Sequence, residues 1–216
     1  MTDKSEAKKF LVESGVIGVM RADTSEMLMQ AAQAIREGGV RSIEVAMTTP
    51  NALSVIKEVS EELDDVLVGA GTVLDAETAR SAILAGAEFL VSPTVNPNMI
   101  EMARRYDKIV APGAFTPTEI LTAWEAGADL VKVFPASRLG PKFMSDVKAP
   151  LPQVSLMPTG GVSKDNAADF IRSGADVICV GSALLDNQAV ENGNYGVLTR
   201  NDTDLIKAVK KGRQSK

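Results

Sequence analysis

The chain has 216 residues, of which 45% are hydrophobic and 24% are charged, as in an average globular protein, and this composition argues against disorder. It has 23 basic and 28 acidic residues and a formal net charge of −5, which argues against nucleic-acid binding through a basic face. The complete lack of histidine excludes His-ligated zinc, His-dependent triads and any His general base.

The length predicts one domain, residues 1–216, because domains commonly hold about 100–200 residues. Cys179 is the single cysteine and cannot form an internal disulfide. The first nine residues are polar and charged, unlike a secretory signal, and no apolar run approaches the roughly 18 residues of a spanning helix. We therefore expect a soluble, cytoplasmic protein with neither a membrane nor a nucleic-acid partner.

Short apolar runs alternate with amphipathic segments along the chain. The runs that predict strands are rich in Val, Ile, Leu or Ala and span 16–21, 42–47, 67–71, 89–93, 109–113, 130–135, 155–159 and 177–182. Segments with apolar residues at helical spacing include 26–37, 52–63, 76–85 and 118–126, with further helices expected over 5–14 and 203–211. This alternation indicates parallel strands joined by helical crossovers.

Two local signals mark the ends of the helices. A cap residue precedes a proline at Thr49-Pro50, Asn96-Pro97 and Thr116-Pro117, which predicts helix starts there. A four-residue motif, made of a small residue, Gly, Ala and an acidic residue in that order, recurs at 85–88, 126–129 and 173–176, with a looser copy at 38–39. The glycine is expected to end each helix in a left-handed conformation, and the acid to precede a buried strand.

The repeated strand–helix unit predicts an α/β fold, a (β/α)₈ TIM barrel with a short N-terminal helix. Such barrels typically need about 250 residues, so this one would be compact. An open, doubly wound parallel sheet is the competing architecture. The first strand lacks a following Gly-x-Gly-x-x-Gly, and no Gly-Lys-Ser/Thr phosphate motif occurs, so the nucleotide-binding versions of that sheet are not supported.

Two charged residues interrupt predicted strands. Alternation along 42–48 sends Glu44 and Thr48 toward the barrel axis, and Glu44 is costly there unless it is paired or functional. Lys132 stands alone in an apolar run, where lost solvation favours the neutral amine that attacks a carbonyl. A structural ion pair between the two residues is the plainer alternative. Two inward charges of opposite sign favour a functional pair, with both residues as catalytic candidates.

Several predicted strands end in residues suited to anions. Gly160 and Gly161 follow the seventh strand, and Gly181 and Ser182 end the eighth, where barrels commonly bind a phosphate through backbone N–H groups. Each glycine pair also satisfies turn geometry alone. Arg21 closes the first strand and could hold a carboxylate or a phosphate, although an outward ion pair is equally compatible. Cys179 and the strand methionines are interpreted as packing residues.

These residues, in this order, resemble the family of KDPG (2-keto-3-deoxy-6-phosphogluconate) and 4-hydroxy-2-oxoglutarate aldolases, the class I pyruvate aldolases. The resemblance runs from the second strand to the eighth. It is carried by Ile43-Glu44-Val45, Gly69-Ala70-Gly71-Thr72-Val73, Val91-Ser92-Pro93, Pro112-Gly113, Val131-Lys132-Val133-Phe134-Pro135-Ala136, Pro158-Thr159-Gly160-Gly161 and Gly181-Ser182.

The resemblance implies a trimeric barrel that forms a Schiff base with a small 2-oxo acid and needs no metal or other cofactor. Lys132 would form the imine and Glu44 would transfer protons. The remaining implied roles concern substrate binding: Thr72 for the carboxylate, Pro93 and Phe134 as pocket walls, Thr159 near the reacting centre, and Gly160, Gly161 and Ser182 for a distal phosphate.

One departure from the family pattern concerns the substrate carboxylate. The best-known bacterial members carry an arginine four residues after the glutamate, where this chain has Thr48. The carboxylate would then rely on Thr72, backbone N–H groups and Arg21. The loop 137–142 also resembles the branch that acts on phosphorylated deoxy-galactonate acids. The aldehyde half of the substrate therefore stays open.

Other functions remain compatible with the residues. A phosphosugar isomerase or epimerase would share the glycine phosphate site but would form no covalent adduct with pyruvate. A metal-dependent aldolase is disfavoured by the lack of histidine. A non-catalytic sugar-phosphate-binding protein would bind ligand without turnover, although the presence of both Glu44 and Lys132 argues against it.

Overall fold

The computed structural model describes residues 3–21 and 25–214. Its strands are β1 (Val16–Met20), β2 (Ser42–Ala46), β3 (Leu67–Gly71), β4 (Phe89–Val91), β5 (Ile109–Ala111), β6 (Gly113–Ala114), β7 (Val131–Val133), β8 (Leu156–Pro158) and β9 (Ile178–Val180). The helices are α1 (Lys4–Ser14), α2 (Ser25–Glu37), α3 (Ala52–Glu62), α4 (Ala76–Leu84), α5 (Pro97–Arg105), α6 (Pro117–Glu125), α7 (Gly140–Lys148), α8 (Ala167–Arg172), α9 (Asn187–Glu191) and α10 (Gly196–Gln214), with a 3₁₀ turn at Ala136–Arg138.

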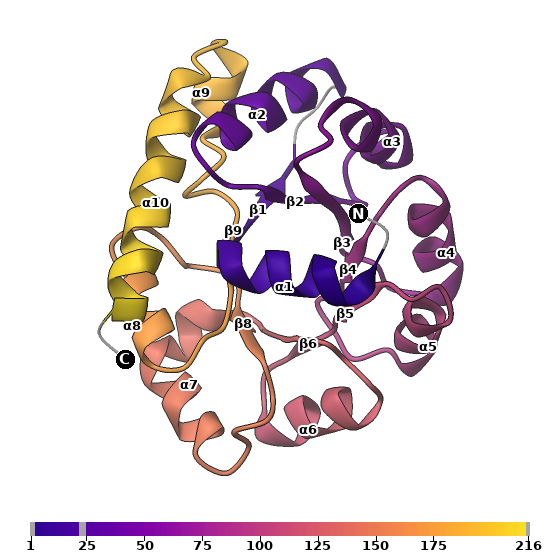
Figure 1. Ribbon diagram of the computed structural model, residues 1–216, viewed down its shortest axis with the longest axis vertical. Coiled ribbons are helices and arrows are strands. Elements are labelled where there is room, and N and C mark those ends of the chain that lie inside the picture. The colour runs from indigo at the N-terminus through magenta and orange to yellow at the C-terminus, as the bar shows by residue number, and fades with distance from the viewer. Residues whose placement is uncertain (1–2, 22–24, 215–216) are drawn as a thin grey trace.

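The strands form a curled parallel sheet in the middle of the molecule, with helices around it (Figure 1). Six strands pair in the order β5-β4-β3-β2-β1-β9, and three pair in the order β6-β7-β8. A parallel bridge between Thr159 and Cys179 connects the end of β8 to β9. The expected α/β class with parallel strands is therefore confirmed.

The strands separate two layers of buried side chains, as a period of two requires. The outer layer packs against the helices and includes Ile43, Val45, Val131 and Val133. The inner layer lies between the strands and includes Ile17, Leu67, Phe89, Ile109, Leu130, Met157 and Cys179. Glu44 and Lys132 alternate with the outer residues, so both point inward, as the sequence predicted.

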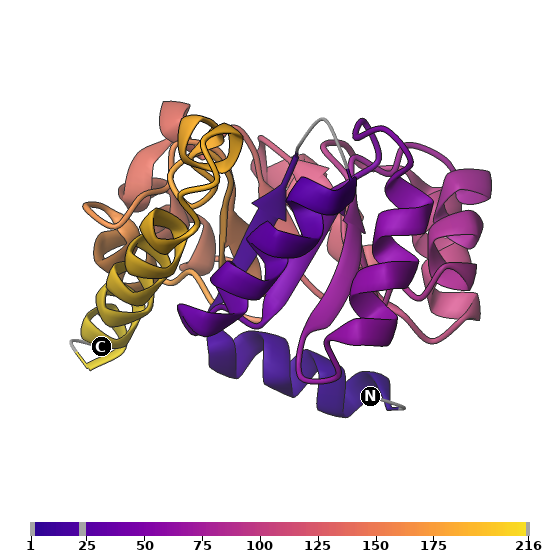
Figure 2. The same ribbon diagram turned by 90° about the horizontal axis from the view of Figure 1, so that it is seen from above.

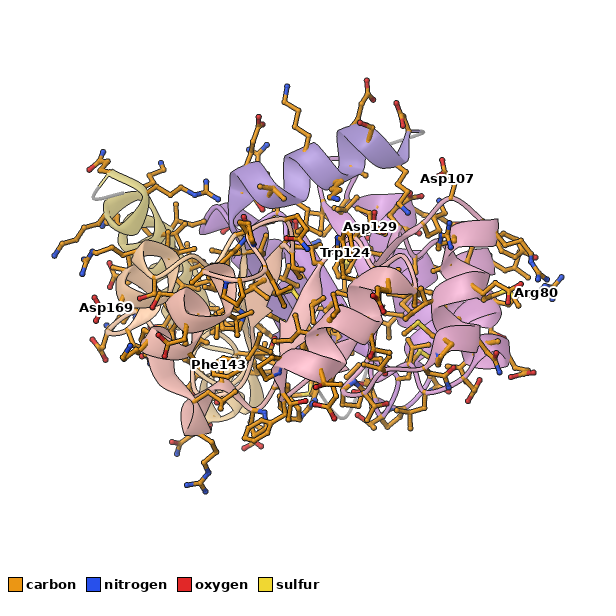
Figure 3. The ribbon with its side chains drawn as sticks, turned by 90° about the horizontal axis from the view of Figure 1, so that it is seen from below. Arg80, Asp107, Trp124, Asp129, Phe143 and Asp169 are labelled. Carbon is orange, nitrogen blue, oxygen red and sulfur yellow. The ribbon has the colours of Figure 1, made fainter. Side chains whose placement is uncertain are left out.

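Helix α1 lies across the amino-terminal ends of the strands (Figure 2). Its buried residues Ala7 and Leu11 belong to the inner cluster, and Lys4 forms an ion pair of 2.9 Å with Asp129. Figure 3 shows Asp129 on this side of the molecule. The helix therefore closes one end of the inner layer and leaves the other end accessible.

The recurring Gly-Ala-acid junctions have the expected geometry. Gly39, Gly86, Gly127 and Gly174 all have φ between 98° and 112°, the region that favours glycine. The acid that follows accepts a backbone hydrogen bond in two of the copies: Asp129 from Val110 N–H at 3.0 Å, and Asp176 from Leu156 N–H at 2.9 Å. Each of these acids thus ties one strand to the start of the next.

The structure corrects three boundaries. Pro112 has no N–H and interrupts the fifth predicted strand, which becomes β5 and β6. Thr49-Pro50 does not cap a helix, because α3 begins at Ala52 after Asn51 in a left-handed conformation. The last helix starts at Gly196 rather than at residue 203. Within the described ranges, no helix is long and apolar enough to cross a membrane.

Candidate active site

A cavity of about 440 Å³ opens at the carboxyl ends of the strands, opposite α1. Its polar lining comes from six strands or the loops that follow them: Arg21, Glu44, Thr72, Lys132, Thr159, Cys179 and Ser182. Three glycines and five apolar residues complete it: Gly160, Gly161, Gly181, Val19, Pro93, Phe134, Val162 and Leu185. Parallel strands deliver their carboxyl ends to one edge, which explains how residues distant in sequence meet here.

Glu44 is held deep in this cavity by β2, with 2% of its surface exposed. Burial raises the pKa of its carboxyl above the usual range, because charge is poorly solvated there, while Lys132, the Cys179 thiol and Arg21 act in the opposite direction. A Cβ at Gly71 on the neighbouring strand would overlap Glu44 Oε1. Glycine at position 71 therefore makes room for the carboxylate.

Lys132 projects into the same cavity from β7 and is 6% exposed. Its Nζ lies 4.9 Å from the centroid of the Phe134 ring, so the ring of Phe134 covers one side of the amine. Among the described side chains, no ion pair within 4 Å joins Lys132 to Glu44. The two side chains therefore share a cavity without a direct ion pair between them, although the charge of Lys132 still acts on Glu44.

The glycines after β8 make a tight turn at the cavity rim. Gly160 has φ 86° and Gly161 has φ 78°, and a Cβ at Gly161 would lie 2.5 Å from Ser137 Cβ. No side chain fits there without displacement of Ser137. After β9, the Gly181 carbonyl accepts the N–H groups of Leu184 and Leu185, which starts a second turn beside Ser182. Two turns of exposed backbone at adjacent strand ends suit an anion.

Thr72 has a left-handed backbone, with φ 57°, directly after β3. This conformation is strained for a β-branched residue, and such strain clusters at functional sites. Its side chain lines the cavity, as does Arg21 from the end of β1. The two residues expected to hold the substrate carboxylate therefore reach the same space as Lys132.

Thr48 is the one candidate that the structure leaves outside the cavity lining. It is exposed, and β2 ends two residues before it at Ala46. The inward alternation predicted for residues 42–48 therefore stops before Thr48. Every other candidate residue lines the cavity: Arg21, Glu44, Thr72, Pro93, Lys132, Phe134, Thr159, Gly160, Gly161, Gly181 and Ser182.

Sequence reasoning missed Cys179 as part of the cavity. It was interpreted as a packing residue, and it is indeed fully buried in the inner cluster. Its Sγ also lies 3.4 Å from Glu44 Oε2, and it lines the cavity. The available signal was the period of two along 177–182, which places Cys179 on the same face as Gly181. Val19, Val162 and Leu185 were likewise not singled out.

The described residues contain no cluster of three or more Asp, Glu or Cys side chains arranged to hold a metal ion. The charged groups in the cavity are Arg21, Glu44 and Lys132. The chemistry that these residues can perform themselves is attack by an amine, transfer of a proton by a carboxyl group and binding of an anion.

Comparison with known proteins places this geometry in a family. The family model of KDPG and KHG aldolases matches residues 7–201. The 2-dehydro-3-deoxy-phosphogluconate aldolase of Treponema pallidum is 36% identical over 185 residues, which cover 85% of this chain and 88% of that protein.

Two solved structures share the fold over almost the whole chain. The KDPG aldolase of Legionella pneumophila, with pyruvate captured at low pH as a covalent carbinolamine intermediate, is 25% identical with a TM-score of 0.85, covering 92% of this chain and 97% of that one. The native KDPGal structure is 30% identical with a TM-score of 0.85, covering 92% and 96%. The chain belongs to the KDPG and KHG aldolase family.

Proposed function

We propose that the protein is an aldehyde-lyase, a class I aldolase that cleaves KDPG to pyruvate and glyceraldehyde 3-phosphate, 4-hydroxy-2-oxoglutarate to pyruvate and glyoxylate, or both. The observation that carries the proposal is that Glu44 and Lys132, two buried ionisable side chains, line the same cavity. Membership of the KDPG and KHG aldolase family supports the same reaction class.

Lys132 performs the first step of the proposed mechanism. Its unprotonated amine attacks C2 of the 2-oxo acid, and loss of water gives a protonated imine. The imine then accepts the electron pair of the C3–C4 bond as that bond breaks. The covalent carbinolamine of pyruvate in the Legionella pneumophila enzyme supports an adduct of this kind.

Glu44 moves the protons. Its carboxylate takes the proton of the C4 hydroxyl as the aldehyde leaves, and the resulting acid protonates C3 of the enamine. Water then hydrolyses the imine, which releases pyruvate and regenerates Lys132. The raised pKa of Glu44 supports this double role, because a carboxyl group titrating closer to neutrality both accepts and returns a proton readily.

The remaining cavity residues divide between the two ends of the substrate. Thr72 and Arg21 hold the carboxylate, without help from Thr48, which lies outside the lining. Gly160, Gly161, Gly181 and Ser182 bind a distal phosphate through their turns. Thr159 lies near the reacting centre, and Pro93 and Phe134 form apolar walls.

A second substrate is favoured by a specific feature of this chain. The loop 137–142 resembles the branch that acts on phosphorylated deoxy-galactonate acids, and the native KDPGal structure is as similar in fold as the KDPG aldolase from Legionella pneumophila. The alternative substrate is 2-dehydro-3-deoxy-6-phosphogalactonate, which differs from KDPG at C4. The ratio of kcat/KM for the two C4 epimers distinguishes the alternatives.

The proposal also covers the overall architecture of the chain and its oligomeric state. Counting β5 and β6 as one interrupted strand, we propose that residues 1–216 form a single (β/α)₈ barrel that works as a homotrimer in the cytoplasm. The bridge between Thr159 and Cys179, which links β8 to β9, supports closure of the sheet. Sedimentation equilibrium tests the trimer.

The decisive experiment is intact-protein mass after borohydride reduction with pyruvate. We expect a gain of one reduced pyruvyl group, which is absent in Lys132→Ala. The same reduction with Arg21→Ala, which retains the lysine, provides a matched control that still forms the adduct at high pyruvate. A folded wild-type protein without any adduct would overturn the aldolase proposal and favour a phosphosugar isomerase or a non-catalytic binding protein.

A further inference from the structure

Cys179 is the one polar residue of the cavity lining to which the proposed mechanism gives no role. It belongs to β9, the strand that pairs with β1 on the side away from β2. Its side chain is fully buried, and its Sγ lies 3.4 Å from Oε2 of Glu44, within the range of a hydrogen bond to sulfur. A thiol in this position touches the carboxylate that the proposal makes the proton carrier.

The thiol is a donor in this contact. Burial raises the pKa of the Cys179 thiol well above its usual range, and the negative charge of Glu44 adds to this effect, while Lys132 and Thr159 oppose it. The group therefore keeps its proton at neutral pH. A protonated thiol beside a carboxylate donates its hydrogen bond to the carboxylate oxygen.

The opposite side of the same carboxyl group is also confined. Gly71 approaches so closely that a Cβ there would overlap Oε1 of Glu44. The carboxyl group is thus lodged between the backbone of β3 and the thiol of β9. Because Cys179 contacts only Oε2, Oε1 is left without a side-chain hydrogen bond in the described structure and can exchange protons with a substrate.

We infer that Cys179 is a positioning residue, whose thiol holds Oε2 of Glu44 and so orients the carboxyl group toward the substrate. The inference rests on the proposed aldolase function, in which Glu44 carries the proton. A thiol suits the task because it is a weak donor, so it orients the carboxylate with little resistance to protonation of Glu44. A general base works only when it is placed within hydrogen-bond reach of its proton.

The test compares Cys179→Ala, Cys179→Ser and Val180→Ala. Serine keeps a donor, whereas alanine removes it. Val180 is the next residue on β9, is equally buried and packs on the helix side, so its truncation removes volume without touching Glu44. Three readouts are measured for each variant: the borohydride-trapped pyruvate adduct, exchange of the pyruvate methyl protons in D₂O, and the pH profile of kcat for aldol cleavage.

We expect Cys179→Ala to form the pyruvate adduct at the wild-type pyruvate concentration, because Lys132 is untouched. Methyl-proton exchange and kcat should fall roughly 5- to 10-fold, about the effect of one hydrogen bond, with little change in KM. The acidic limb of the profile should move to higher pH, since the thiol lowers the pKa of Glu44. Cys179→Ser should recover most of the lost rate.

A direct signature is available because the chain has one cysteine. The infrared S–H stretching band of the wild-type protein should show the shift of a hydrogen-bonded thiol, and Glu44→Ala should remove that shift. This measurement holds even if Cys179→Ala fails to fold.

Two results would overturn the inference. Either Cys179→Ala behaves like Val180→Ala in kcat and pH profile, or the S–H band does not respond to Glu44→Ala. In both cases Cys179 only packs. Loss of the adduct from the wild-type protein would instead overturn the proposed function itself, so the two failures are distinguishable.

Discussion

The two ends of the curled sheet use the inward faces of the same strands in opposite ways. At the amino-terminal end, α1 lies across the ends of the strands (Figure 2), and its Leu11 belongs to the same buried apolar cluster as Ile17 and Leu67. At the carboxyl end, the inward positions carry Glu44 and Lys132, and a cavity of about 440 Å³ remains above them. Because every strand pair is parallel, all the amino ends of the strands lie at the end covered by α1 and all the carboxyl ends lie at the cavity.

The end covered by α1, the closed end, therefore contributes mainly to stability, and the cavity end, the open end, contributes mainly to chemistry. Apolar burial at the closed end contributes to folding, whereas buried charge at the open end opposes it, as the raised pKa of Glu44 indicates. Substitutions at the open end should therefore change turnover with a small effect on unfolding, and substitutions at the closed end should do the reverse.

The largest effect is expected for Lys132→Ala at the open end. Loss of the amine removes the imine and with it the electron sink, so turnover should fall to the background of the assay. The circular dichroism spectrum should stay as in the wild type. Residual turnover within tenfold of wild type would show that another group starts the reaction.

Glu44→Gln should lower kcat by about 10²- to 10⁴-fold, the usual contribution of general acid–base catalysis. The pyruvate adduct should still form. In the wild type, burial raises the pKa of Glu44, so turnover should decline as pH falls through that raised pKa, because the carboxylate is the base. The variant should lack this acidic limb, and full turnover in the variant would contradict the assignment of the base.

Leu11→Ala at the closed end should lower the free energy of unfolding by about 2–5 kcal/mol, because a fully buried leucine leaves a cavity. Urea unfolding at neutral pH measures the change. The kcat and KM of the folded protein should equal the wild-type values. A tenfold fall in kcat would show that the two ends are coupled.

Asp202 provides a buried carboxyl group outside both ends. It lies on α10 against Gly38, neither oxygen has a hydrogen-bond partner, and burial raises its pKa to about 8. The folded state therefore holds a proton that the unfolded state releases near pH 4, so stability should fall as pH rises from about 4 to 8. The expected slope from this residue is about 1.4 kcal/mol per pH unit.

Asp202→Asn should remove that contribution to the slope, and urea unfolding at several pH values between 5 and 8 measures it. Asp165→Asn, on an exposed side chain, serves as the matched control and should leave the slope unchanged. A wild-type slope that persists in Asp202→Asn would show that other groups set the pH dependence.

The smallest effect is expected for Lys4→Ala, which breaks the 2.9 Å ion pair between α1 and Asp129. An ion pair near the surface contributes about 0–1 kcal/mol, so the urea midpoint should shift slightly or not at all. Lys9→Ala, whose lysine side chain is 75% exposed, is the comparison. A loss as large as that of Leu11→Ala would mean that the ion pair, rather than apolar packing, fastens α1.

Much of this architecture could be predicted from local patterns. Alternation of apolar strands and amphipathic helices predicted parallel strands, and the glycine of each repeated junction adopts the left-handed conformation expected of it. Periodicity also placed Glu44 and Lys132 inward. Period and backbone stereochemistry are local properties, so a single sequence carries them.

Local patterns failed where an element ended earlier or later than its composition indicated. Alternation could not place Thr48, because β2 stops at Ala46. Pro112 split a predicted strand, since a residue without an N–H breaks the ladder of hydrogen bonds. Helix α10 extends to 19 residues because its apolar side packs on α8 and α2, which composition alone does not reveal.

The sequence by itself determined the strand–helix order, the inward direction of two charges and the resemblance to the family. Only the tertiary structure decided which of the candidates share one cavity and that Cys179 touches Glu44. Cys179 and Glu44 are 135 positions apart in the sequence, so no helical or strand periodicity could have predicted that they touch. Their contact follows from the curvature of the sheet, which brings β9 beside β1 and the thiol within reach of a carboxylate on β2.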